Sequence, residues 1–295
     1  MAEAILVVAN PRSGKGRSSR VAREFCKKAS RAGFTPVVID VLGKAEMTQA
    51  LVNQIKNLRS DLKGIVSIGG DGLLHTLLPI IHTYELPFTV IPTGTGNDFA
   101  REIGATRRTL DETVAILSRP ASTIDSVLIK SDQGDARACQ VLSLGFDALV
   151  NERANGFRRV RGKLKYVLAI IRELTLFKPL HFTITIDGQD YSRRAMLIAV
   201  ANGPSYGGGM KICPGARFDD GLLDVLILSE VSILELIKVF PRVYSGSHIS
   251  HPAVEIIRGK EISVNAPAKA FADGEYIAEL PISIRVEPGS LKVWK

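Results

Sequence analysis

Short apolar runs alternate with amphipathic stretches over residues 1–120. The runs are rich in β-branched residues and are bounded by turn residues, which is typical of buried strands. Between the first two runs, Val21, Phe25, Ala29 and Ala32 recur at helical spacing. This alternation predicts a parallel sheet flanked by helices. The predicted strands are 5–9, 36–41, 64–68 and 87–91, and the other predicted helices are 46–58, 73–83 and 109–118.

The pattern changes near Arg119-Pro120, after which most of the chain reads as strands. Asp187-Gly188 and Asp273-Gly274 predict hairpins. We therefore expect an N-terminal α/β domain at 1–121 and a β-rich sandwich or barrel at 122–286, with a last strand at about 287–295 that is free to return to the first domain. The predicted strands are 123–130, 138–144, 181–187, 193–201, 222–229 and five short runs between 253 and 294, and the predicted helices are 160–176 and 231–243.

Composition narrows the class of protein. With 45% hydrophobic and 23% charged residues, the chain matches globular proteins and neither disordered nor fibrous ones. No apolar run approaches the roughly 20 residues that span a bilayer, and the first run has no basic flank or cleavage site. The three cysteines lack a paired spacing, which excludes a disulfide framework and a local zinc site. We expect a cytoplasmic protein.

The net charge of +8 is concentrated in two segments: residues 12–31 carry +7 and residues 151–178 carry +6. Such patches indicate an anionic partner, namely phosphates, nucleic acid or a membrane face, although solvated helix faces give the same pattern. No nucleic-acid recognition motif accompanies the charge, so we expect no nucleic-acid partner.

Three glycine-containing loops, at 10–16, 69–72 and 92–98, each follow a predicted strand of the first domain. Open α/β sheets bind ligands at the carboxyl ends of their strands, and glycine lets backbone N–H groups approach phosphates. A single loop of this kind is usually only a turn, but three favour a phosphate-bearing ligand. The site is not a Walker A loop, because Ala9 and Gly16 replace its first Gly and its Ser/Thr, and Phe99 breaks a GxGxxG pattern.

The motifs NPRSGKG, GGDG and PTGTGNDFA together resemble the catalytic domain shared by diacylglycerol kinases, sphingosine kinases and soluble bacterial lipid kinases. SLGFD, DDGLLD and ADGE follow in the expected order, so the resemblance runs from Asn10 to Glu275. It implies an α/β nucleotide-binding domain, a C-terminal β-sandwich, and transfer of the γ-phosphoryl group of ATP to a lipid hydroxyl with Mg²⁺.

The resemblance also assigns roles to particular residues. The implied catalytic residues are Glu275, Asp98, Lys15 and Arg101. The implied cofactor-binding residues are Asn10, Arg12, Ser13, Gly14, Gly16, Gly69, Gly70, Asp71, Gly72, Gly94, Thr95 and Asn97. The implied metal-binding residues are Asp71, Asp125, Arg217, Asp220 and Leu222.

Two of these roles compete with plainer interpretations. By pattern alone Glu275 follows a hairpin turn, whereas the resemblance makes it the general base for the lipid hydroxyl. Asp220 reads as a turn residue, whereas the resemblance makes it a ligand of a second, structural Mg²⁺ with the carbonyls of Arg217 and Leu222. Asp125 would connect that ion through water towards Asp71, the ligand of the catalytic Mg²⁺.

The acceptor is less defined. Leu73, Leu74, His75 and Thr76 stand where bacterial relatives usually have Thr-(Leu/Ile)-Asn-Glu, and they resemble sphingosine kinases more. Diacylglycerol is the expected acceptor, and a sphingoid or other lipid is the alternative. An NAD kinase-like soluble-substrate kinase and a non-catalytic regulator also compete.

Residues 151–178 combine basic side chains with an apolar run, which is what a surface-binding membrane segment requires. We therefore expect a protein that is peripheral on the inner, anionic membrane face and meets its lipid there. A helix packed with its apolar face inside would give the same pattern. The sequence leaves a homodimer open.

Overall fold

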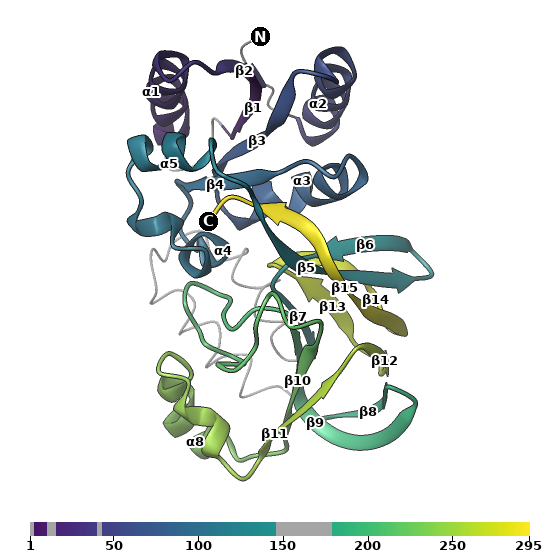
Figure 1. Ribbon diagram of the computed structural model, residues 1–295. Helices are drawn as coiled ribbons and strands as arrows, with labels where there is room; N and C mark the ends of the chain where they lie inside the picture. Colours follow the sequence, from purple (N-terminus) through teal and green to yellow (C-terminus); the bar gives the residue numbers. More distant parts are fainter. Residues whose placement is uncertain (1–2, 11–15, 40–42, 146–178) are drawn as a thin grey trace. The chain divides into compact units, whose positions relative to one another are not determined.

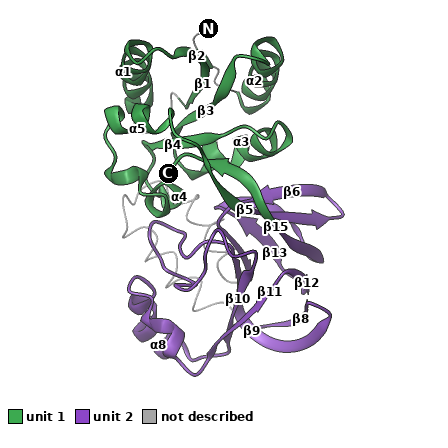
Figure 2. Ribbon diagram, in the orientation of Figure 1, with its two compact units in different colours: residues 1–125, 288–295 green, residues 126–287 purple. Residues whose placement is uncertain are grey.

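The computed structural model describes residues 3–10, 16–39, 43–145 and 179–295 (Figure 1). The chain divides into two compact units: unit 1 is Met1–Asp125 with Pro288–Lys295, and unit 2 is Ser126–Glu287 (Figure 2). Strands β5 (Ser122–Ser131) and β15 (Ile282–Val293) each run from one unit into the other. The sequence pattern places its divisions after residues 121 and 286, because it changes where strands begin and end and not within them.

Unit 1 is a parallel sheet flanked by helices, as predicted. Its elements are β1 (Ala4–Ala9), α1 (Arg17–Arg31), β2 (Thr35–Ile39), α2 (Lys44–Leu58), β3 (Leu62–Gly69), α3 (Asp71–Thr83), β4 (Phe88–Pro92), α4 (Asp98–Glu102), a 3-10 helix at Ala105–Arg107 and α5 (Leu110–Ile116). The strand order is β2-β1-β3-β4 and then the end of β15, with every pairing parallel. Figure 1 shows α1 and α5 on one face and α2 and α3 on the other. All six residues of β1 are buried, because helices cover this central strand on both faces.

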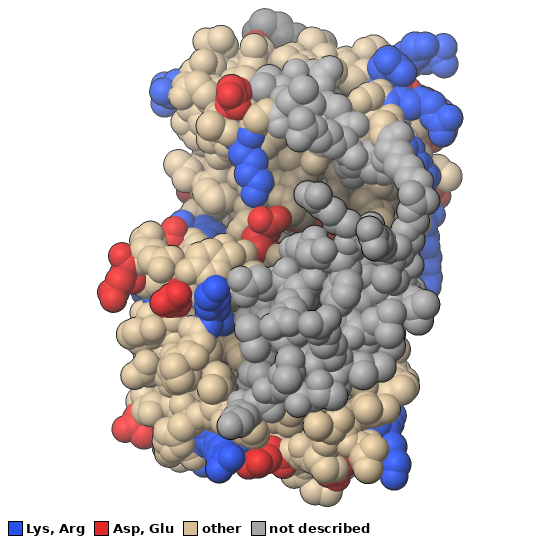
Figure 3. All heavy atoms as spheres, turned by 180° about the vertical axis from the view of Figure 1, so that it is seen from behind, with Lys and Arg blue, Asp and Glu red and all other residues tan. Residues whose placement is uncertain are grey.

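Helix α1 packs on the sheet through Ala22, Phe25 and Ala29, while Val21 is only partly buried. Its basic residues lie away from this face, and Arg20, Lys27 and Arg31 are exposed. Both Lys/Arg and Asp/Glu side chains lie on the described part of the surface in Figure 3. The described part of the 12–31 basic segment is thus a solvated helix face. The second basic segment, 151–178, and the predicted helix 160–176 lie outside the described residues.

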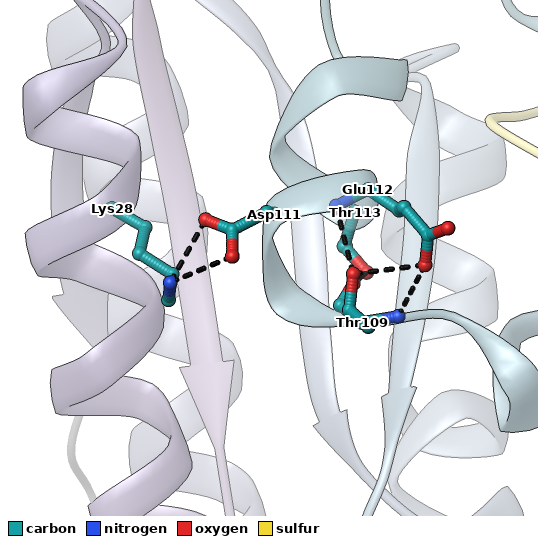
Figure 4. Close-up of polar contacts among 5 residues, drawn as sticks. All are labelled: Lys28, Thr109, Asp111, Glu112 and Thr113. Carbon is teal, nitrogen blue, oxygen red and sulfur yellow. Dashed lines mark hydrogen bonds and ion pairs between the residues drawn. The ribbon is translucent and has the colours of Figure 1, made fainter.

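Helix α5 is joined to α1 and capped at its own start (Figure 4). Lys28 donates to both carboxylate oxygens of Asp111 at 2.8 Å. Thr109 accepts the Glu112 N–H at 3.2 Å, and the Glu112 carboxylate accepts the Thr109 N–H at 2.7 Å. This reciprocal capping box lowers the pKa of Glu112, chiefly through the backbone hydrogen bond from Thr109 and then through the Thr109 side chain.

Removing the cap should cost more stability than removing the ion pair. We expect Thr109→Ala to lower the free energy of unfolding by about 1 kcal/mol, because it leaves the orphan N–H groups of the first turn without an acceptor. Asp111→Asn should cost about 0.5 kcal/mol or less, since the Asp111 side chain is 74% exposed and water screens the pair. Urea unfolding of the two variants beside wild type checks the order, and equal losses would contradict it.

Unit 2 is antiparallel. Its elements besides parts of β5 and β15 are β6 (Gly134–Ala138), β7 (Val141–Gly145), β8 (Leu180–Ile186), β9 (Gln189–Ala201), β10 (Leu223–Ser229), α8 (Ile233–Val239), 3-10 helices at Phe240–Val243 and Ser247–Ser250, β11 (Val254–Gly259), β12 (Glu261–Asn265), β13 (Lys269–Ala272) and β14 (Glu275–Glu279). The strands follow the order β14-β13-β7-β9-β8-β12-β15, with β10 between β9 and β11. The pairings within this order are antiparallel, so the predicted β-rich half is confirmed.

Both predicted hairpins form through the same backbone geometry. Asp187 and Gly188 have φ values of 48° and 82° between β8 and β9, and Asp273 and Gly274 have 52° and 86° between β13 and β14. Two consecutive positive φ angles match the twist of the flanking strands, and Asp-Gly tolerates them. The predicted strand 138–144 is instead divided between β6 and β7.

Candidate active site

The parallel order of unit 1 brings two glycine loops together. Strands β3 and β4 are neighbours and end at Gly69 and Pro92, so the loops after them begin at the same edge of the sheet. The N–H of Thr93 donates to the carbonyl of Gly69 at 2.9 Å. On the other side of β3, Asn10 directly follows β1. The Asn10 N–H donates to the carbonyl of Ile68 at 3.3 Å. The expected convergence at the carboxyl ends is present for the described parts of the loops.

Glycine is required here because the two loops touch backbone to backbone. A Cβ atom built on Gly94 would lie 2.8 Å from the Cα of Gly70 and 3.0 Å from Oδ1 of Asn97. A Cβ on Gly96 would lie 2.9 Å from Oδ2 of Asp71. The cavity left between the loops measures only about 10 Å³. The loops are therefore a packed platform whose outer side is what a ligand can meet.

We expect Gly94→Ala to lower the free energy of unfolding by about 1–3 kcal/mol, because its Cβ would force the two loops apart. Gly215→Ala is the matched control: a Cβ there meets nothing within 4 Å, and φ is not in the left-handed region. Its expected change is within about 0.5 kcal/mol. Urea unfolding compares them, and an equally stable Gly94→Ala would refute the close-packing argument.

Asn97 holds the second loop in shape. Its backbone is left-handed, with φ 54°, a conformation that asparagine tolerates better than most residues. Its side-chain Nδ2 donates to the Gly94 carbonyl at 2.7 Å, and its Oδ1 accepts the Gly94 N–H at 3.1 Å. One side-chain amide thus closes both sides of the Gly94 residue, which leaves Thr95 exposed at the tip of the loop.

Asp71, the first residue of α3, caps the next helix in this site. One carboxylate oxygen accepts the N–H of Asp98 at 3.1 Å and the other accepts the N–H of Phe99 at 3.3 Å. A negative charge at the start of α4 satisfies N–H groups that lack partners inside the helix. The ring of Phe99 stacks on Phe88 with centroids 5.7 Å apart, which anchors α4 on the sheet.

Asp98 and Arg101 form an ion pair in the first turn of α4. Nη1 of Arg101 donates to Oδ1 of Asp98 at 2.5 Å, and Nη2 donates to the Gly96 carbonyl at 2.9 Å. Asp98 is 4% exposed, whereas the Arg101 side chain is 40% exposed. The pair therefore connects a buried carboxylate to the glycine loop and leaves part of a guanidinium at the surface.

The other sequence-predicted residues of unit 1 belong to the first two glycine loops. Arg12, Ser13, Gly14 and Lys15 lie outside the described residues. Gly16, at φ 86°, leads directly into α1. Gly69, Gly70 and Gly72 are in place around the start of α3, and the Gly72 carbonyl accepts the Thr76 hydroxyl at 2.9 Å.

Two polar contacts escaped the sequence reasoning. The Ser18 and Thr93 hydroxyl oxygens lie 2.8 Å apart and are buried, which connects α1 to the loop after β4. Asp125 accepts the Gly289 N–H at 2.8 Å, and so holds the returning end of β15 in unit 1. The sequence around Ser18 and around Asp125 has no pattern that would predict partners so far away in the chain.

In unit 2, Glu275 is the first residue of β14 and is half-buried. The preceding Asp273 fixes the hairpin: its carboxylate accepts the N–H groups of Cys139 at 3.1 Å, Gln140 at 3.1 Å and Val141 at 3.3 Å. These bonds explain why the predicted strand 138–144 is interrupted, because the N–H groups of residues 139–141 donate to the Asp273 carboxylate. Asp273 thus acts as a positioning residue for the start of β14, a role the sequence did not suggest.

Asp220 is paired in the structure. Its Oδ1 accepts the N–H of Leu222 at 3.1 Å, and its Oδ2 accepts a hydrogen bond from Arg258. Nε of Arg258 also lies 3.4 Å from Oδ1 of Asp224, whose pKa burial raises despite that guanidinium. The guanidinium of Arg217 is engaged by Asp219 at 3.3 Å.

The described residues fit one of the two predicted magnesium sites better than the other. Asp71 offers a hard carboxylate among glycine loops, and Mg²⁺ is commonly held by one or two carboxylates plus substrate phosphates. Asp220 would have to exchange Arg258 for the ion, and that second site stays a prediction. Among the residues described, no group of three or more His, Cys, Asp or Glu side chains is arranged to hold a metal ion.

Comparisons with known proteins find two families, one matched by each half of the chain. Residues 4–129 match the family described as the diacylglycerol kinase catalytic domain, and residues 140–295 match the family described as the YegS C-terminal NAD kinase beta sandwich-like domain. The second match makes the antiparallel unit a β-sandwich-like domain, as predicted.

Two curated relatives and one solved structure are similar over nearly the whole length. A diacylglycerol kinase of Mycobacterium tuberculosis is 32% identical over 293 residues, covering 98% of this chain and 94% of the relative. A diacylglycerol kinase of Staphylococcus carnosus is 25% identical over 283 residues, covering 93% and 89%. A crystal structure of a diacylglycerol kinase from Bacillus anthracis shares the fold, with a TM-score of 0.73 and 22% identity over 99% of this chain and 96% of that one.

Proposed function

Because this chain belongs to the diacylglycerol kinase family, we propose that it transfers the γ-phosphoryl group of ATP to a lipid hydroxyl, with diacylglycerol as acceptor and phosphatidic acid as product. The glycine-loop platform, with Asp71 and the Asp98–Arg101 pair held in it, is the observation that carries this proposal. Phosphoryl transfer depends mainly on positioning and on neutralising charge, and a rigid set of loops and charged groups supports both.

The proposal gives each group one task. Glu275 accepts the proton of the lipid hydroxyl as that oxygen forms its bond to the γ-phosphorus and the bond to ADP breaks. Arg101 offers positive charge beside the loop, and Lys15 and Arg12 are expected to do the same. Asp71 would hold Mg²⁺, which when bound supplies positive charge against the phosphates. Thr95 and Asn97 would contact the nucleotide.

An apolar cavity in unit 2 supports a lipid acceptor. It has a volume of about 80 Å³ beneath α8, and its lining includes Met196, Leu226, Leu236, Phe240 and His248. An almost wholly apolar wall suits the end of an acyl chain better than a soluble, charged acceptor such as NAD⁺.

A sphingoid lipid is the second candidate, because Leu73, Leu74 and His75 resemble sphingosine kinases more than bacterial diacylglycerol kinases. One atom of the cavity also bears on the chain of the acceptor. Nε2 of His248 lies 3.0 Å from the Ile212 carbonyl, so it carries the proton, and Nδ1 is a buried acceptor without a partner in the described part of the chain. Burial lowers the pKa of His248, which keeps the ring neutral. A lipid whose chain carries a hydrogen-bond donor away from the phosphorylated hydroxyl would satisfy Nδ1.

A phosphate-transfer assay decides among these acceptors. Wild type would be given labelled ATP, with and without Mg²⁺, and mixed micelles of diacylglycerol, sphingosine, ceramide or monoacylglycerol, beside NAD⁺. Mg²⁺-dependent labelling of diacylglycerol is the expected result. Labelling of sphingosine instead would establish the second candidate, and labelling of NAD⁺ alone would refute a lipid acceptor. ATP binding without transfer would favour a regulator.

Where the protein works follows from the acceptor. None of the helices in the described residues is both long and apolar enough to cross a bilayer. We propose, because the proposed acceptor is a membrane lipid, that the protein is peripheral and reaches this lipid from the cytoplasmic side of the inner membrane. We propose no nucleic-acid partner.

A further inference from the structure

Exposed apolar side chains concentrate in one short segment of unit 2. Leu234 is 72% exposed, far more than any other large hydrophobic residue in the described parts of the chain. Four further residues of the same segment are each about two-fifths exposed. We call these five residues the α8 patch: Ile233, Leu234, Ile237, Tyr244 and Ile249. Elsewhere in the described chain, Val38 and Tyr276 alone are comparable.

The core of unit 2 does not need these side chains. Helix α8 and the 3-10 helix after it already have an inward face, on which Leu236 is buried and Val239, Phe240 and Val243 line the apolar cavity. A surface helix normally pairs one apolar face with a polar one. Here the outward face is apolar as well, and contiguous exposed apolar patches on proteins mark sites of interaction.

Charges beside the patch identify the kind of partner. Lys238 is exposed and follows Leu234 by one helical turn, so the two lie on the same outward face. Glu235 lies off this face and its carboxylate is 3.1 Å from Nε2 of His251, so it does not oppose the lysine. Residues 231–251 contain Lys238 and Arg242 against Glu235 alone, which leaves this segment weakly positive.

We propose that the α8 patch docks on the surface of an anionic lipid bilayer. Aliphatic side chains with a lysine among them suit a membrane interface, because the leucine and isoleucines enter the acyl boundary while the lysine amine stays at the headgroups. A protein interface is less suited, since the cores of such interfaces are depleted in lysine. This inference rests on the proposed function in supposing that the chain must meet a lipid in a bilayer.

Docking of the α8 patch would also bring the apolar cavity beneath α8 near the membrane. The patch and the cavity share one segment, in which the exposed Ile237 and Tyr244 stand beside the cavity-lining Val239 and Val243, and the Tyr244 ring packs edge-on against the cavity-lining Phe240. A bilayer against the patch would therefore bring the cavity close to the membrane-contacting residues. Docking through the α8 patch does not depend on the basic segment 151–178, which lies outside the described residues.

Vesicle flotation of the full chain tests the docking surface. The probe is phosphatidylcholine vesicles with and without phosphatidylglycerol. The double variant Leu234→Ser/Ile237→Ser should lower the partition coefficient onto anionic vesicles by about tenfold or more, since two aliphatic side chains lose their burial. Val38→Ser, which removes an aliphatic side chain that is 48% exposed in unit 1, should leave it unchanged. Equal partitioning of both variants would overturn the proposal.

A fluorescent variant locates the contact itself. Trp294 is the chain's one tryptophan and is only 3% exposed, so Leu234→Trp adds a reporter on the patch against a buried background. Its emission should shift to shorter wavelength on anionic vesicles and be quenched by brominated acyl chains. An unshifted emission from vesicle-bound protein overturns the proposal. So does a Leu234→Ser/Ile237→Ser variant that has a lower oligomer mass than wild type but the same vesicle partitioning, because that result assigns the patch to contact with a second copy of the chain.

One control separates this proposal from the proposed function. Phosphorylation of a short-chain diacylglycerol dissolved as monomers needs no bilayer, so the Leu234→Ser/Ile237→Ser variant should keep wild-type activity on it. If wild type phosphorylates no lipid in that assay, the proposed function fails, and the flotation and fluorescence results still decide whether the patch docks.

Discussion

Glu275→Gln is expected to lower kcat for phosphate transfer to the lipid by about 10²–10⁴-fold, the usual contribution of a positioned general base. The amide keeps the size of the side chain but cannot take the proton of the lipid hydroxyl. ATP binding and the melting temperature should stay as in wild type, because the change is isosteric and Glu275 is only half-buried.

Glu279→Gln supplies the matched comparison, since Glu279 ends the same strand and is exposed. It should retain full activity. The rates are measured with labelled ATP and saturating diacylglycerol micelles at fixed Mg²⁺. Should Glu275→Gln keep more than about a tenth of the wild-type kcat, a role as base would be excluded by magnitude.

The second large effect concerns stability. Asp273→Ala removes the shared acceptor of the N–H groups of Cys139, Gln140 and Val141, all in buried residues. Unpaired buried N–H groups cost about 1–3 kcal/mol each, so the free energy of unfolding should fall by roughly 3 kcal/mol or more. In a protein of this size that loss corresponds to a melting temperature about 6–12 °C lower.

Part of that loss would come from the turn, because Asp273 has φ 52° and alanine is strained there. Asp273→Gly accepts this φ and removes only the carboxylate, so it isolates the lost hydrogen bonds. Asp190→Ala, which removes one exposed hydrogen bond to Thr185, should barely change the melting temperature. Calorimetry of the three variants measures the difference, and an Asp273→Gly variant as stable as Asp190→Ala would contradict the anchoring role.

Features set by neighbouring residues were predictable from the sequence. The parallel and antiparallel halves follow from patterns with short periods, and both Asp-Gly hairpins form with the expected pair of positive φ angles. The glycines of the loops were also recognised, but only as places where a phosphate could approach. That Gly94 must also be small because Gly70 lies against it depends on two loops meeting in space.

Contacts between distant residues could not be predicted. Nothing around Asp273 or Asp220 states that their partners are Cys139 and Arg258, which stand far away in the chain. Which apolar side chains are exposed could not be predicted either. The pattern at 231–243 predicts a helix, yet its apolar residues lie on both faces, and periodicity alone does not tell which face the core takes.

The position of Trp294 has a consequence for synthesis on the ribosome. Its backbone N–H donates to the Phe88 carbonyl at 2.8 Å, and its own carbonyl accepts the Thr89 hydroxyl. Its indole N–H donates to the Arg119 carbonyl, and its ring is buried in the core of unit 1. Residues 4–125 therefore emerge first but cannot complete their core until residue 294 has also left the exit tunnel, by which time all of unit 2 has been made. Unit 2 needs Val286 of the same strand β15 for its own core, so both units are completed only at the end of synthesis, and the unit that holds the glycine loops is completed last.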